Sequence, residues 1–115
     1  MSLAKKLNLK DASPIRVVGR PSGVDLDDVV VTRAAGCPNV LVFARMMADV
    51  DARLADVRAA ALADDIAWIA YPKAGQLGTD LSRDILWRHL LPTGIQGIRQ
   101  VAIDEVWSAI RFRPA

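Results

Sequence analysis

Two short segments of the chain are apolar at every position, residues 40–44 and residues 66–71. Strands buried on both faces have this pattern, and parallel sheets contain such strands because helices cover both of their sides. Shorter apolar runs at 15–19 and 29–32 predict two more strands, the second rich in β-branched valine. We therefore expect a mostly parallel sheet at the core.

Helical spacing of apolar residues follows the strand at 40–44. Asp49 can cap this helix, and the apolar residues that follow it recur at helical spacing, so they share one face of the helix. They are Val50, Leu54, Val57 and Ala61. A short N-terminal helix capped by Ser2 is also expected, with Leu3 and Leu7 on one side.

A further helix is expected from about Leu81 to Leu91, with Thr79 or Asp80 as its N-cap. Pro92 and Gly94 end it. Its apolar side is predicted to carry Leu81, Ile85 and His89, together with Leu86 and Leu90.

The C-terminal segment predicts a hairpin of strands at 98–103 and 106–112, joined at Asp104-Glu105. A connection this short requires antiparallel pairing. The last strand is apolar on both faces, so we place it inside the sheet, and the more polar strand 98–103 at the edge. The predicted order takes the strands beginning at Val29, Ile15, Val40, Ile66, Val106 and Ile98. The linker after Val31 is too short for a helical crossover, so the direction of the strand at 29–32 stays open.

Three segments carry a resemblance to a family of short uncharacterised bacterial proteins: 71–73 (YPK), 79–84 (TDLSRD) and 101–112 (VAIDEVWSAIRF). In topology, the inserted final strand resembles the C-terminal half of the class I S-adenosylmethionine-dependent methyltransferase fold. The resemblance implies a Rossmann-like sheet and no particular activity, because fold does not determine function. The turn at 19–23 lacks the spacing of a glycine-rich cofactor loop, and no acidic residue follows Val31 to hold a ribose. We expect no cofactor.

Composition narrows the class of protein. The 115 residues fit a single α/β domain, 1–115, with 15 basic and 13 acidic side chains and a net charge of +2. The basic residues are scattered, so no nucleic-acid surface is expected. One cysteine and one histidine exclude a disulfide framework and a Cys/His metal site. No apolar run is long enough for a membrane span, and the N-terminus lacks a signal-peptide pattern, so a cytoplasmic protein is expected.

The loop at 73–80 is the leading candidate site, because it leaves the carboxyl end of a central strand and enters a helix. Lys73 supplies charge, Thr79 a hydroxyl, and Arg83 lies four residues after Thr79. Asp84 is placed to tether Arg83 or Lys73. We expect Lys73, Thr79 and Arg83 to converge on a small anionic ligand with Asp84 as the tether, or else the four residues to clamp the loop. Asp104 with Glu105, His89 and Cys37 lack partners that would make them catalytic.

Three functions remain open. The first is a non-catalytic, self-associating module. It follows from the scarcity of helices in the first 40 residues, which would leave one apolar sheet face to pair with a second copy. The second is a binder of small anionic ligands that uses the Lys73–Arg83 loop. The third, which the sequence favours least, is a reduced methyltransferase-like protein.

Overall fold

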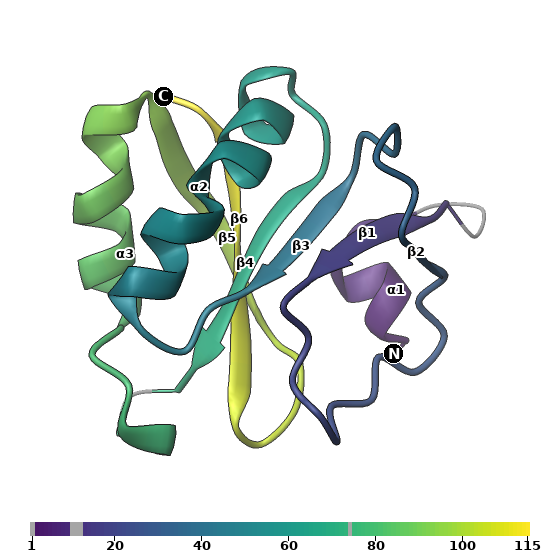
Figure 1. The fold of residues 1–115 in the computed structure, drawn as a ribbon, viewed down its shortest axis with the longest axis horizontal. Helices are drawn as coiled ribbons and strands as arrows, with labels where there is room; N and C mark the ends of the chain where they lie inside the picture. The colour runs from purple at the N-terminus through teal and green to yellow at the C-terminus, as the bar shows by residue number, and fades with distance from the viewer. Residues whose placement is uncertain (1, 10–12, 74) are drawn as a thin grey trace.

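The computed structural model describes residues 2–9, 13–73 and 75–115, and Ala74 of the candidate loop lies outside them. The fold is mixed α/β with one six-stranded sheet in the order β2-β1-β3-β4-β6-β5 (Figure 1), which confirms the predicted order. Strands β1 to β4 are parallel, and β6 pairs antiparallel with both β4 and β5. The strands are β1 Ile15–Val18, β2 Val31–Thr32, β3 Val40–Phe43, β4 Ala67–Pro72, β5 Ile95–Ala102 and β6 Trp107–Pro114.

The open question about the strand at 29–32 is answered by its length and register. β2 has two residues and runs parallel to β1, and Thr32 and Val40 both lie beside Arg16. The linker between β2 and β3 therefore only has to pass the amino end of β1, without returning along a strand. Cys37 Sγ and Asn39 Nδ2 both donate to the carbonyl of Pro14, which holds the linker there. A parallel strand is thus possible without a helical crossover.

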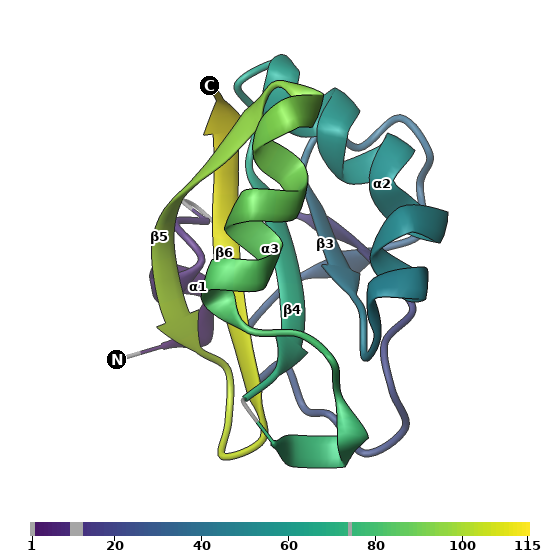
Figure 2. The ribbon, with the colours of Figure 1, turned by 90° about the vertical axis from the view of Figure 1, so that its left-hand side faces the viewer.

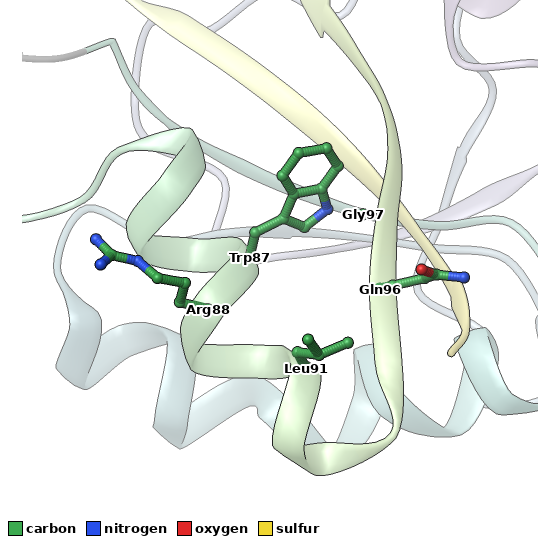
Figure 3. A pocket seen from close by; sticks show the side chains of 5 residues that line it. All are labelled: Trp87, Arg88, Leu91, Gln96 and Gly97. Carbon is green, nitrogen blue, oxygen red and sulfur yellow. The ribbon is translucent and has the colours of Figure 1, made fainter.

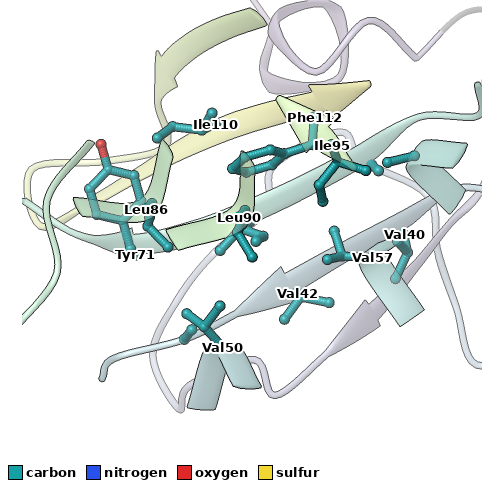
Figure 4. Close-up of a cluster of buried hydrophobic side chains, with 14 of the residues drawn as sticks. Val40, Val42, Val50, Val57, Tyr71, Leu86, Leu90, Ile95, Ile110 and Phe112 are labelled. Carbon is teal, nitrogen blue, oxygen red and sulfur yellow. The ribbon is translucent and has the colours of Figure 1, made fainter. Parts of the chain in front are cut away.

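Helices α2, Met47–Leu62, and α3, Arg83–Leu90, cover one face of the sheet (Figures 1 and 2). The core under them combines valines of β3, leucines of α3 and aromatic residues of β4 and β6 (Figure 4). The α2 stripe is confirmed at Val50, Val57 and Ala61, and Leu54 packs against the core from its rim. Asp49 acts from the third helical position, where its carboxylate accepts the N–H of Met46.

The predicted start of α3 is wrong, and its predicted apolar side is confirmed for Leu81, Leu86 and Leu90 but wrong for Ile85 and His89. Ser82 is the N-cap, because its hydroxyl accepts the N–H of Ile85, and the 3₁₀ turn Gln76–Gly78 occupies the preceding loop. The helix therefore begins later and buries Leu86 and Leu90, while Ile85 and His89 face outward. The 3₁₀ turn Leu91–Thr93 follows α3 and ends at Gly94, whose φ is 95°.

The opposite sheet face is covered, contrary to the expectation of an open apolar surface. Helix α1, Leu3–Lys6, is capped by Ser2 as predicted, and it lies on this face with the loop at 24–29 (Figure 1). Leu7 is fully buried there, and its carbonyl accepts the Trp68 indole N–H at 3.0 Å. Segments with little regular structure can thus cover a sheet when their leucines are spaced to reach it.

No helix of the described residues is both long and apolar enough to cross a membrane.

Candidate functional site

A small pocket of about 200 Å³ lies at the carboxyl end of β4, where the chain turns toward α3. Lys73 follows β4 directly, and Ser82 and Arg83 form the N-terminus of α3. Its lining residues are Tyr71, Lys73, Ser82, Arg83, Gln100 and Ser108. Two of the four predicted residues, Lys73 and Arg83, therefore meet in one pocket.

The other two predicted residues lie elsewhere. The Thr79 hydroxyl donates to the carbonyl of Arg45 and accepts the N–H of Leu81, so Thr79 holds the loop. Asp84 does not line this pocket; its carboxylate lies 3.5 Å from Arg83 Nε. The two side chains of this ion pair are more than half exposed, so the contact orients Arg83 weakly. Thr79 and Arg83 do not meet across a helical turn because the helix begins only at Arg83.

Ser108 is the least expected member of the pocket. It is 5% exposed, and its hydroxyl makes no hydrogen bond with any residue that the structure describes. Its oxygen is not among the side-chain atoms that are closed off from solvent, so the hydroxyl reaches solvent at the pocket wall although most of the residue is buried. The position of Ser108 on the pocket wall leaves the hydroxyl available to a ligand.

Tyr71 adds a second hydroxyl. Its oxygen accepts the Gln100 side-chain N–H at 2.7 Å, which leaves the phenolic hydrogen free to be donated. Burial raises the pKa of Tyr71, with Arg83 acting in the opposite direction, so the phenol stays protonated at neutral pH.

The polar groups around the pocket share one property: each of them can donate a hydrogen bond. The ammonium of Lys73, the guanidinium of Arg83 and three hydroxyls line it, and no carboxylate of a described residue does. The first N–H groups of α3 have no acceptor inside the helix, and the helix dipole places partial positive charge at the same end. This donor set matches an oxyanion.

A groove continues from this pocket between α3 and β5. Its middle part, about 180 Å³, is lined by Arg83, Trp87 and Ile98, among others. Its far part, about 430 Å³, lies beside Trp87, Leu91 and Gly97. In Figure 3, Trp87 of α3 and Leu91 of the turn after it project toward β5, whereas Arg88 extends away from β5.

Gly97 makes the closeness of α3 and β5 possible. A Cβ built on Gly97 would lie 1.6 Å from Trp87 Nε1, so the indole rests directly on the backbone of β5. Arg83 lies over the ring, with its Cζ 5.7 Å from the ring centroid. Trp87 is thus held between the strand and the cation, with 38% of its surface exposed.

The remaining chemical candidates have structural roles. Asp104 accepts the N–H groups of Val106 and Trp107 and so shapes the hairpin. His89 Nε2 lies 2.7 Å from Asp51 Oδ1 and links α3 to α2. Among the described residues, no group of three or more His, Cys, Asp or Glu side chains could hold a metal ion.

Sequence reasoning missed Tyr71, Ser82, Gln100 and Ser108. Two of them could have been found in the sequence. Tyr71 is two residues before Lys73 and so is expected on the same side of the strand, and Ser108 is a polar residue within an apolar strand. Gln100 left no such signal, because its place depends on the register of β5 with β6.

Comparisons with protein families, with curated proteins and with solved structures found no match.

Proposed function

We propose that this protein is a binding module for small anionic ligands, which it takes at the pocket formed by Lys73, Arg83 and Ser108. The unpartnered hydroxyl of Ser108, in a pocket whose polar groups can all donate hydrogen bonds, carries the proposal. We regard the parallel part of the sheet as Rossmann-like, and in such sheets ligands bind beyond the carboxyl ends of the strands. No catalytic step is assigned.

Inorganic phosphate is the first probe. A ligand at ten times its Kd stabilises the folded state by about 1.4 kcal/mol, which for a domain of this size raises Tm by about 4–6 °C. We expect phosphate to produce such a rise at constant ionic strength. Lys73→Ala is expected to abolish it while leaving the Tm without phosphate nearly unchanged.

Lys5→Ala is the matched control, because Lys5 is an exposed lysine on α1, at the opposite sheet face. It is expected to keep the full phosphate effect. A different result would contradict the proposal: Lys73→Ala lowers Tm in the absence of phosphate, and no anion stabilises the wild type. Lys73 and Arg83 would then serve as a structural clamp.

Self-association is the second candidate function, and one observation favours it. Four large apolar side chains that are at least one-third exposed lie on α3, on the turn after it and on β5: Ile85, Trp87, Leu91 and Ile98. Since β5 is the edge of the sheet, a second copy could pair with it across a two-fold axis. Light scattering at tens of micromolar should then give twice the 12.5 kDa chain mass, and Ile98→Glu should restore the monomer. A wild-type mass of one chain would exclude this assembly.

A further inference from the structure

The anion pocket and the two parts of the groove lie in a row along α3, and we call this row the channel. Its two ends differ chemically, and Trp87, which rests on the backbone of β5, stands between the middle and the far part. Arg83 lines both the anion pocket and the middle part, and Trp87 lines both the middle and the far part. Adjacent parts therefore share a wall residue. The channel follows α3 along its length, since Lys73 and Ser82 stand at one end and Leu91 at the other.

Polarity changes along this channel. The end at β4 has the donor groups of Lys73, Arg83 and Ser108. The other end has the indole edge of Trp87, the Leu91 side chain and the bare backbone of Gly97. Leu91 is 53% exposed and Trp87 38%, so both have apolar surface that a ligand can cover. A ligand that fills the whole channel needs one anionic end and one apolar end.

The charge around the channel distinguishes two possible occupants of its apolar part, a second copy of this chain and an anionic ligand with an apolar chain. Two cationic side chains, Lys73 and Arg83, line the channel, and Arg88 lies at its rim; the only carboxylate there among the described residues is that of Asp84. A second copy would bring its own arginines against these. An anion with an apolar chain meets both the charge and the apolar surface without repulsion.

We propose that the natural ligand is an amphiphilic anion, in which a carboxylate or phosphate group is joined to a linear apolar chain. This inference rests on the proposed function, since the same pocket binds the anionic group. The chain passes over the exposed side of Trp87 and lies against Leu91. Its length follows from the helix: eight residues separate Arg83 from Leu91, which at ~1.5 Å per residue gives a channel about 12 Å long. A medium-length alkyl chain spans this distance.

The test measures Kd by calorimetry for acetate, hexanoate, octanoate and decanoate, all below their micelle concentrations. Burial of one methylene is worth up to about fourfold in affinity, and a half-open channel is expected to give about twofold. Octyl phosphate beside octanoate distinguishes the two anionic groups. Decyltrimethylammonium, which has the same chain with a positive charge, is expected not to bind.

Two variants test which residue contacts each end of the ligand, Leu91 for the apolar chain and Lys73 for the anionic group. Leu91→Gln is expected to leave phosphate binding unchanged and to remove most of the gain with chain length. Leu62→Gln is its control, because Leu62 is an exposed leucine at the end of α2, outside the channel lining. Lys73→Ala is expected to weaken every member of the series by a similar factor.

The outcomes separate this inference from the proposed function. If phosphate binds through Lys73 but chain length brings no gain, or the same gain in Leu91→Gln, the ligand is a small anion and the amphiphile is excluded. If decyltrimethylammonium binds as well as decanoate, the apolar surface does not select an anion and the amphiphile is excluded, while the phosphate test alone decides the proposed function. If neither phosphate nor any carboxylate binds, both proposals fail.

Discussion

Trp107 shows how one buried side chain connects two strands. It is 5% exposed, and its ring meets Phe43 edge to face, with ring centroids 5.2 Å apart. Loss of such a contact adds to the cost of the cavity that truncation leaves. The burial of Trp107 confirms the expectation that the last strand lies inside the sheet.

Trp107→Ala is expected to lower the free energy of unfolding by about 3–5 kcal/mol, which is a large part of the stability of a domain this size. Chemical denaturation measures the change. Trp87→Ala, at the more exposed tryptophan, is expected to cost clearly less. Equal losses for the two variants would mean that Trp107 is not in the core.

Gly97 is the second position where one residue decides local structure. Gly97→Ala would displace Trp87, because the new methyl group and the indole would occupy the same space. We expect a stability loss of about 1–3 kcal/mol and a red shift of the tryptophan fluorescence as the ring moves into water. Gly36→Ala is the control, since a Cβ at Gly36 meets no atom within 4 Å. Unchanged fluorescence in Gly97→Ala would contradict the packing of Trp87 on β5.

Helix α3 is the element whose start was predicted least well. Several residues before it could have served as N-cap, and the sequence pattern favoured the earlier ones. The deciding interaction is nonlocal: Thr79 bonds to the carbonyl of Arg45, and Asp80 accepts the N–H of Met47. These bonds hold the loop against the start of α2 and leave Ser82 to cap α3.

Ser82→Ala is expected to destabilise the protein by about 1 kcal/mol, because Ile85 N–H then loses its acceptor at the helix end. Urea denaturation measures the loss. Ser22→Ala, at an exposed serine in the turn after β1, should be neutral within about 0.5 kcal/mol. If the two variants behaved alike, the helix would not begin where the structure places it.

At the scale of the whole molecule, the N-terminal segment replaces the helix layer that the second sheet face lacks. Leu3, Leu7 and Leu9 are buried against that face, in the same cluster as Leu41 and Trp68. The apolar surface that would have favoured a second copy is therefore occupied within the chain. Of the eight exposed large apolar side chains among the described residues, four lie along α3, the turn after it and β5.

Leu7→Ala tests this covering role. We expect a loss of about 2–5 kcal/mol in the free energy of unfolding, because truncation leaves a cavity in the buried cluster that contains Trp68. Lys5→Ala, at an exposed position of the same helix, should change little. A neutral Leu7→Ala would show that the segment does not pack on the sheet in solution.

The pattern of apolar residues by itself determined the strand order and the two main helices. The runs at 40–44 and 66–71 could only be buried strands, and the short turn at Asp104-Glu105 required a hairpin. These features depend only on the spacing of apolar residues and on the length of the turn, and both can be read from the sequence. The pairing of Lys73 with Arg83 was also within reach, because both flank one loop at the end of one strand.

Only the tertiary structure decided the rest of the site. Ser108 and Gln100 reach the pocket because β6 is inserted beside β4 and fixes the register of β5. Thr79 leaves the pocket because a carbonyl 34 residues away in the sequence takes its hydroxyl. The direction of β2 and the covering of the second face likewise depend on contacts between segments far apart in the chain. Local pattern cannot specify such contacts, because each depends on where the other segment already lies.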